Sequence, residues 1–265
     1  MGSGASAGLR AAVSTSNAAD LKSVVAQLGP EQREKLLKAL EEPKKGMKDM
    51  PMGKWSDEQV AGAMAGLLAG KMGPGEDMLR KVRPWLMPEY KTTITIGQEA
   101  PDAKVFELDG TETTLLQKIS ALGHGAGKLM VLNFGSYTCP VHRSAGPKVE
   151  EICKGMGVEL LHVYIAEAHP KDEWDGGPVN GVEYKQTTSM EERYTIAKAY
   201  REAQKVTGNM VVDDMSNPCD IAYEAKATRL YVLEGGNIIW RTGTPPFQYD
   251  VDGMKEFLAS RTGDK

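Results

Sequence analysis

One cysteine of this 265-residue chain lies where a reactive thiol is expected. Cys139 follows the apolar run KLMVLNFG at 128–135, which predicts a buried strand, and precedes Pro140, which suits the first turn of a helix. Between a strand and a helix, unpaired backbone N–H groups and the helix dipole stabilise a thiolate. Ser136 and Thr138 add hydroxyl groups nearby. The position predicts a reactive cysteine with a lowered pKa; the alternative is a buried, inert cysteine.

No second cysteine follows within the next few residues, and His142 stands three positions on. Cys139 and His142 have the spacing of metal ligands, but no second pair follows them, so we predict no metal site. Cys153 would be separated from Cys139 by roughly 20 Å of helix rise. Cys219 is therefore the better internal candidate for a thiol that resolves a covalent intermediate, and an external thiol is the alternative.

The composition is that of a soluble globular protein, with 41% hydrophobic residues, 26% charged residues and a net charge of −4. It contains no basic block, which argues against nucleic-acid binding. The apolar run at 60–70 is too short for a transmembrane segment, and no secretory signal is present. An odd number of cysteines indicates a reducing, cytoplasmic location. The start MGSGAS fits an N-myristoylation pattern at Gly2, or a flexible start or cloning scar.

The pattern of the chain changes near residue 90. Residues 1–90 predict a helical N-terminal region with a disordered start, which includes two helices within 19–42 and a capping box of Ser56 and Gln59. Residues 91–265 predict a second domain of alternating strands and helices. Its expected strands are 128–135, a second buried strand within 157–169, and 209–214, followed by a hairpin over 228–243. Its expected helices are 144–154, 189–206 and 250–260. This order is typical of an α/β fold with a mixed central sheet flanked by helices.

Ordered sequence blocks within 95–260 resemble a known family. IGQEAPDAKVFELDG followed by LMVLNFGSYTCP is similar to the thioredoxin superfamily, on its peroxiredoxin-like side. VLNFGSYTCP, VYIAEAHPKDEW and VVDDMSNPCDIAYEAKATRLYVLEGGNIIW together resemble the iodothyronine deiodinases. Those enzymes carry selenocysteine at the position of Cys139. The resemblance implies a thioredoxin-like fold and a homodimer.

The resemblance also implies a reaction, the reductive removal of iodide from an iodinated aromatic compound. Cys139 would attack iodine, and Glu167 and His169 would relay a proton to the ring carbon. Tyr164 would support the relay, while Ser136 and Thr138 would hydrogen-bond the nucleophile or orient the relay. No bound cofactor is expected. An external thiol, such as dithiothreitol, glutathione or the thioredoxin system, would supply the electrons.

Substrate-binding candidates come from positions where the chain departs from the family. Thr187 stands where the family has a histidine, and Thr244 where it has an arginine, with Arg241 three residues earlier. Two other functions remain open. One is a peroxiredoxin-like thiol peroxidase in which Arg229 supports the thiolate. The other is a non-enzymatic redox or interaction module whose helical N-terminal region binds a partner.

Overall fold

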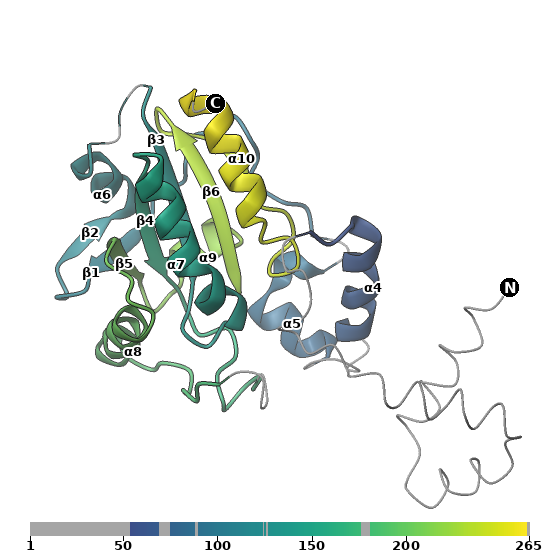
Figure 1. Ribbon diagram of the computed structural model, residues 1–265. Coiled ribbons are helices and arrows are strands. Elements are labelled where there is room, and N and C mark those ends of the chain that lie inside the picture. The colour runs from purple at the N-terminus through teal and green to yellow at the C-terminus, as the bar shows by residue number, and fades with distance from the viewer. Residues whose placement is uncertain are drawn as a thin grey trace, which may run out of the picture. The chain divides into compact units, whose positions relative to one another are not determined.

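A computed structural model describes residues 54–68, 75–87, 90–123, 125, 127–175 and 181–263 (Figure 1). Met50–Lys265 forms one compact unit. Gly2 and the two helices predicted within 19–42 lie outside the described residues.

The described unit contains a short helical stretch followed by an alternating α/β region. In chain order its elements are α4 (Asp57–Leu68), α5 (Glu76–Val82), the 3-10 helix η2 (Pro84–Leu86), β1 (Lys104–Glu107), β2 (Glu112–Thr114), α6 (Leu115–Ala121), β3 (Leu129–Gly135), α7 (Pro140–Gly155), β4 (Glu159–Tyr164), α8 (Met190–Ala203), β5 (Asn209–Asp213), α9 (Pro218–Ala222), β6 (Thr228–Glu234), β7 (Asn237–Arg241) and α10 (Val251–Thr262).

The strands form one mixed sheet in the order β2-β1-β5-β4-β3-β6-β7. β3, β4 and β5 are parallel to one another, and the remaining pairs are antiparallel. β3 is an inner strand of the sheet and is almost wholly buried, which explains its continuous apolar run. The predicted hairpin is confirmed: Gly235 and Gly236 join β6 to β7 with positive φ angles of 59° and 87°. A βαβ unit followed by a hairpin and a helix is the thioredoxin-like topology, so the predicted fold class is confirmed.

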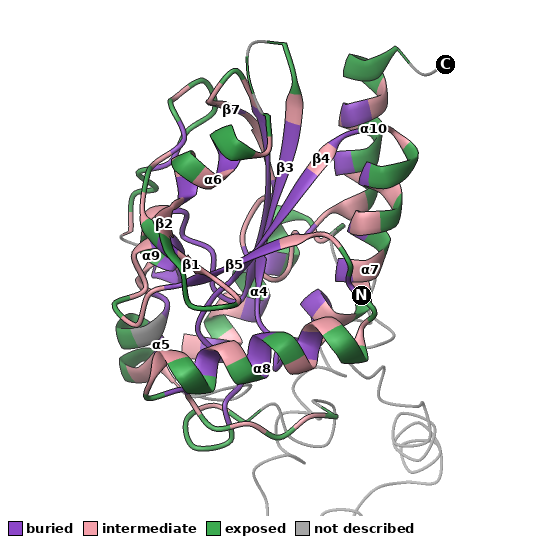
Figure 2. Cartoon of the chain, turned by 90° about the vertical axis from the view of Figure 1, so that its left-hand side faces the viewer, coloured by how far each residue is buried: buried purple, intermediate pink, exposed green. Residues whose placement is uncertain are grey.

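Helices cover both faces of the sheet (Figures 1 and 2). α7 and α10 pack on one face through a cluster that includes Val131, Cys139 and Met254. α8 covers β4 and β5 on the same face through a second cluster. The opposite face carries α6 and α9, whose Leu115 and Cys219 join the largest core cluster. Figure 2 shows the central strands as almost continuously buried.

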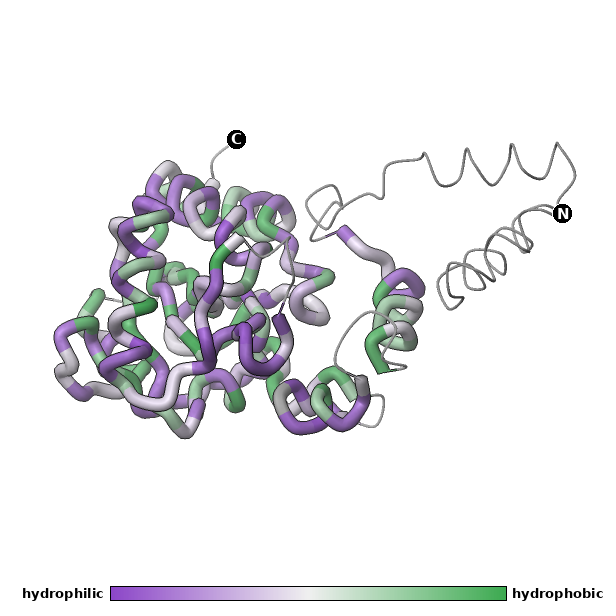
Figure 3. Tube along the Cα trace, turned by 90° about the horizontal axis from the view of Figure 1, so that it is seen from below, coloured by the Kyte–Doolittle hydropathy of each residue, from purple (hydrophilic) through white to green (hydrophobic). Residues whose placement is uncertain are grey.

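The segment before the sheet begins as predicted. Ser56 N–H donates to Gln59 Oε1 at 2.9 Å, and Gln59 N–H donates to Ser56 Oγ at 3.2 Å, so the capping box is confirmed. α4 buries Val60, Ala63 and Leu67, one face of a helix. Figure 3 shows hydrophilic and hydrophobic stretches alternating along the helices, which is expected when one helix face packs on a core.

Side chains of this segment reach the rest of the unit. Arg83 Nη2 donates to Ala168 O at 2.9 Å, and Trp85 Nε1 donates to Lys226 O at 3.0 Å. A domain boundary at residue 90 stays a prediction. None of the described helices is long and apolar enough to cross a membrane.

The pairing of β3 with β4 determines where polar side chains meet. Gly135 pairs with Tyr164, so both strands end at the same level of the sheet. The carboxyl ends of parallel strands share one edge. The turn 136–139, which leads into α7, therefore lies beside the loop 165–169.

Candidate active site

Two hydroxyl groups connect the turn 136–139 to the loop 165–169. Ser136 Oγ accepts the N–H of Ala168 at 2.9 Å, and Thr138 Oγ1 accepts the N–H of His169 at 3.0 Å. Both hydroxyls are buried. They hold the loop that carries Glu167 and His169 against the turn that carries Cys139. Of the two predicted roles for these hydroxyls, their hydrogen bonds fit the orientation of the relay.

Glu167 is a buried carboxyl at the centre of this arrangement. It accepts the N–H of Thr138 at 2.9 Å and the O–H of Tyr164 at 2.5 Å. The Tyr164 hydroxyl in turn accepts the N–H of Tyr137 at 3.0 Å. Burial raises the pKa of Glu167, although these hydrogen bonds oppose the shift. The carboxyl is therefore poised to hold a proton closer to neutral pH than an exposed glutamate would.

Cys139 occupies the N-cap position of α7 and is fully buried. As expected from the sequence, the backbone N–H groups of Val141 and His142 face the sulfur and lower its pKa. The predicted lowering of the Cys139 pKa is wrong, because burial has the largest effect and raises the pKa of the thiol. Sequence position indicated the helix N-terminus, whereas the packing of the strand, α7 and α10 around the sulfur determines its desolvation.

Two guanidinium groups oppose the effect of burial on Cys139. Arg83 and Arg143 both lower the thiol pKa, Arg83 more than Arg143. The Arg83 side chain is buried, and its guanidinium lies 4.6 Å from the ring centroid of Trp174. Burial lowers the pKa of Arg83 to about 10. Arg83 was missed because it lies in the predicted helical N-terminal region, outside the blocks that resemble the family, and no motif surrounds it.

The loop 165–169, which carries Glu167 and His169, has a further support that the sequence analysis missed. Gln186 accepts the N–H of Glu167 at 3.1 Å through Oε1 and donates to the carbonyl of Glu167 at 3.2 Å through Nε2. These two hydrogen bonds hold the backbone of Glu167 in place. Only the adjacent position, Thr187, was a candidate from the sequence.

His169 is buried and lies edge-on against Trp174, with ring centroids 4.8 Å apart. Burial, with smaller contributions from the nearby Arg83 and Lys226, lowers the pKa of His169 to about 3. The imidazole is therefore neutral near pH 7. The role of His169 in the proton relay stays a prediction, and its apolar and cationic surroundings favour the neutral form of the ring.

His142 occupies the position where a second redox cysteine could stand. Thr228 Oγ1 donates to Phe134 O at 2.8 Å, so its only hydroxyl proton is used there. His142 Nδ1, 3.3 Å from Thr228 Oγ1, must then be the N–H donor. The ring also stacks on Tyr200 at 5.0 Å. His142 thus ties α7 to the sheet. Over the described part of the chain, no group of three or more His, Cys, Asp or Glu side chains could hold a metal ion.

The two other cysteines are buried thiols at different places. Cys219 belongs to α9, where its N–H donates to Asp213 Oδ1 at 3.0 Å, and it lies on the sheet face opposite Cys139. Cys153 shares the core cluster of Cys139, and burial raises its pKa to about 12. Cys219, the predicted internal resolving thiol, is therefore not brought together with Cys139.

The three substrate-binding candidates are divided between two places. Thr187 is buried, and its Oγ1 accepts Arg193 Nε at 3.2 Å. Arg241 and Thr244 line a pocket of about 270 Å³ at the end of the β6–β7 hairpin. Arg229 lines the same pocket and pairs with Glu224. The proposed support of the thiolate by Arg229 is wrong: on β6 it lies on the same sheet face as Tyr231, away from α7, and Arg83 takes that electrostatic position.

The chain is similar in sequence to known deiodinases. The chain is 32% identical to a thyroxine 5-deiodinase of Rattus norvegicus over 61% of its own length and 52% of that protein. It is 31% identical to a type I iodothyronine deiodinase of Xenopus laevis, over 69% and 70% of the two chains. The chain thus spans about half the length of the thyroxine 5-deiodinases that it matches.

Among solved structures, the thioredoxin domain of a thiol-disulfide oxidoreductase from Bacteroides vulgatus aligns with a TM-score of 0.41 at 16% identity, covering 63% of this chain and 99% of that one. The sequence profile of the iodothyronine deiodinases matches residues 68–262, which include Arg83, the turn 136–139 and the loop 165–169. The chain therefore belongs to the iodothyronine deiodinase family.

Proposed function

We propose that this protein is a thiol-dependent reductive deiodinase that removes iodide from an iodinated aromatic compound of the iodothyronine type. The observation that carries the proposal is the meeting of Cys139, at the N-terminus of α7, with the Glu167–Tyr164 pair in one buried arrangement. A peroxidase would need the thiolate, but not a buried carboxyl with a raised pKa and a tyrosine bonded to it.

The reaction divides into two halves that balance. The Cys139 thiolate attacks iodine; an S–I bond forms, the C–I bond breaks, and its electron pair stays on the ring carbon, which takes up a proton. An external thiol then attacks the Cys139 sulfur and releases iodide, leaving a mixed disulfide. A second thiol frees Cys139 and leaves as the disulfide. The ring is reduced and two external thiols are oxidised.

The Glu167–Tyr164 pair is the proton reservoir of the first half. Because burial raises the pKa of Glu167, its carboxyl can carry a proton nearer neutral pH, and Tyr164 hydrogen-bonds it at 2.5 Å. His169, whose backbone N–H is held by Thr138, contributes a neutral imidazole that can orient or pass a proton without carrying charge. Arg83 favours the thiolate that the attack requires.

The electrons come from outside the chain in this proposal. Cys219 is buried on the opposite sheet face, and Cys153 is buried within the core. A small thiol or a thioredoxin-type protein therefore resolves the intermediate. The protein works in a reducing compartment, where such thiols are available. A homodimer also stays a prediction.

The test measures iodide release from thyroxine and from diiodotyrosine by the full chain with dithiothreitol. Cys139→Ala should abolish release. Glu167→Gln should lower it by about a hundredfold or more, the range of general acid catalysis, while alkylation of Cys139 persists. Cys153→Ala, on the same helix and in the same core cluster, is the matched control and should keep its activity.

A parallel measurement of peroxide consumption separates the alternatives. Iodide release that survives in Cys139→Ala contradicts the proposal. Peroxide consumption dependent on Cys139, without any iodide release, would assign the thiol to a peroxidase instead.

A further inference from the structure

Two buried cations near the reactive thiol have no carboxylate partner of their own. Arg83 is 1% exposed and Lys226 is 5% exposed. Within the described residues neither forms an ion pair, whereas the similarly buried Arg229 pairs with Glu224 at 3.2 Å. Lysine and arginine are almost never fully buried unless they are paired, because an unpaired charge is costly to remove from water. A bound anion would supply the missing partner.

Hydrogen bonds to the backbone place both cations at the active site. Arg83 Nη2 donates to Ala168 O at 2.9 Å, and Ala168 packs in the core cluster of Cys139. Trp85, two residues after Arg83, donates its indole N–H to Lys226 O at 3.0 Å. The residue that follows Lys226 packs in the same core cluster as the thiol. The two cations therefore approach Cys139 from two separate segments of the chain.

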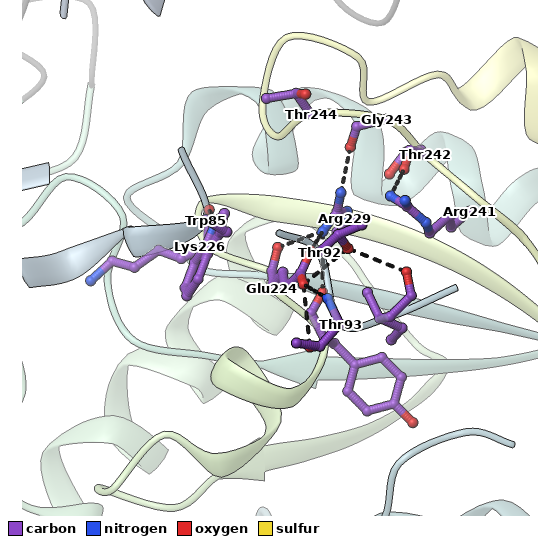
Figure 4. Close-up of polar contacts among 12 residues, drawn as sticks. Trp85, Thr92, Thr93, Glu224, Lys226, Arg229, Arg241, Thr242, Gly243 and Thr244 are labelled. Atoms are coloured by element: carbon purple, nitrogen blue, oxygen red, sulfur yellow. Dashed lines mark hydrogen bonds and ion pairs between the residues drawn. The ribbon is translucent and has the colours of Figure 1, made fainter. Parts of the chain in front are cut away.

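Both cations have hydrogen-bond donors that the described residues do not use. The buried Nε of Arg83 has no hydrogen-bond partner there, and one face of the guanidinium lies over the ring of Trp174. The recorded hydrogen bonds of Lys226 use its backbone N and O, so its ammonium donates none within the same residues. Figure 4 shows this side chain extending away from Arg229 and Glu224. Its charge is therefore not used by that ion pair.

The nearby carboxylates do not neutralise both cations. Asp220 is buried, and its Oδ1 accepts the backbone N–H of Lys226 at 2.7 Å. Burial lowers the pKa of Lys226; Asp220 opposes this shift, and Arg83 adds to it by repulsion. Asp220 also faces Arg83, so one buried carboxylate is shared by two cations. Glu173 is exposed to solvent, and burial raises the pKa of Glu167. One positive charge is therefore left in excess.

We propose that Arg83 Nε and the Lys226 ammonium bind a large monovalent anion beside Cys139, and that this anion is the iodide which the reaction releases. The inference deepens the proposed function and rests on it. When an external thiolate attacks the Cys139 sulfur, an S–S bond forms, the S–I bond breaks, and its electron pair leaves with iodine. A full negative charge thus appears next to Arg83. A buried site favours a large anion, because a smaller one is more costly to take out of water.

Iodide and the thiolate should compete for the same cation. Burial raises the pKa of Cys139, and Arg83 is the charged group that most opposes this rise. Iodide bound by Arg83 would weaken that opposition, so it should raise the thiol pKa. It should therefore slow alkylation of wild-type Cys139 by N-ethylmaleimide near neutral pH. Fluoride at the same ionic strength is the reference, since screening by salt is then equal.

The direct test is a calorimetric titration of sodium iodide into the full chain carrying Cys139→Ala, with sodium fluoride holding the ionic strength constant. We expect saturable binding of iodide. Lys226→Met keeps the unbranched stem and both backbone hydrogen bonds of the residue, and it should weaken binding about tenfold or more, the value of a hydrogen bond to a charged group. Lys226→Arg keeps a cation and should retain binding. Lys198→Met, on the exposed surface of α8, is the matched control and should also retain it.

Several results would overturn the proposal. They are the absence of saturable binding, an unchanged affinity in Lys226→Met, and an alkylation rate that is equal in iodide and fluoride. Loss of binding in Lys226→Arg as well would show that residue 226 acts through packing and not through its charge. Circular dichroism verifies that each variant folds, and Lys226→Gln replaces Lys226→Met if that variant does not. An equal affinity for chloride would overturn the assignment of iodide.

These measurements require no turnover, so they separate this inference from the proposed function. Saturable iodide binding without iodide release from an aromatic compound would count against the proposed function alone. Iodide release without saturable binding would count against the anion site alone.

Discussion

Replacing Arg83 by glutamine tests the electrostatics of the thiol most directly. Arg83 is the charged group that most lowers the pKa of Cys139, ahead of Arg143. Its removal deletes a cation beside the sulfur and leaves burial, which raises the thiol pKa, less opposed. We therefore expect Arg83→Gln to raise the pKa of Cys139.

The size of the change follows from the surroundings. An opposite charge near a group shifts its pKa by about 1–3 units, and burial keeps solvent from screening Arg83. We expect a rise of at least about one unit, or ~1.4 kcal/mol. Arg143 is partly exposed and ranks below Arg83, so Arg143→Gln should produce a smaller rise. Arg83→Gln should also destabilise the fold by ~1.5–3 kcal/mol through the lost charged hydrogen bond to Ala168 O, partly offset because a cation no longer has to be buried.

The assay is a pH titration of ultraviolet thiolate absorbance, with the Cys139→Ala titration subtracted. Cys153 and Cys219 do not interfere, because burial raises the pKa of Cys153 to about 12 and that of Cys219 well above its usual value. Arg83→Lys is the control for charge: it loses the planar fork but keeps the cation. Its midpoint should lie between those of the wild type and Arg83→Gln.

An unchanged midpoint in Arg83→Gln, with folding verified by circular dichroism, refutes the reasoning. A larger shift of the Cys139 pKa in Arg143→Gln than in Arg83→Gln would also refute it, since Arg83 would then not be the charged group that lowers this pKa most.

Two further predictions concern the surroundings of Cys139. Because burial lowers the pKa of His169 to about 3, the imidazole stays neutral between about pH 5 and 8. The pH–rate profile of His169→Asn should therefore keep the wild-type shape even where its rate falls. Loss of an ionisation from that profile would show that His169 titrates in this pH range. A Cβ at Gly146 would overlap the Tyr200 hydroxyl, so Gly146→Ala should destabilise the protein by about 1–3 kcal/mol in urea unfolding. On the same helix, a Cβ at Gly155 meets nothing within 4 Å, so Gly155→Ala is the control and should change the stability little. Equal effects of the two substitutions would contradict this packing argument.

The sequence alone determined the features that depend on local order. The apolar run before Gly135, the proline after Cys139 and the glycine pair at 235–236 predicted a buried strand, a helix start and a hairpin turn, because each reflects backbone preferences of a few neighbouring residues. The motif blocks likewise identified Glu167, Tyr164 and Cys139. Local order also predicted the backbone donors that face the sulfur.

Tertiary structure decided the charges, because electrostatics depends on burial and on groups distant in sequence. Desolvation by the packed helices raises the pKa of Cys139 and keeps His169 neutral, which no spacing of residues reveals. Arg83 reaches the site from 85 residues away to bond Ala168. Tertiary packing likewise separated Thr187, which contacts Arg193 of α8, from Arg241 on β7, and placed Cys219 of α9 on the sheet face opposite Cys139. Sequence thus gives the reacting groups, and only the fold determines the protons and charges that they hold.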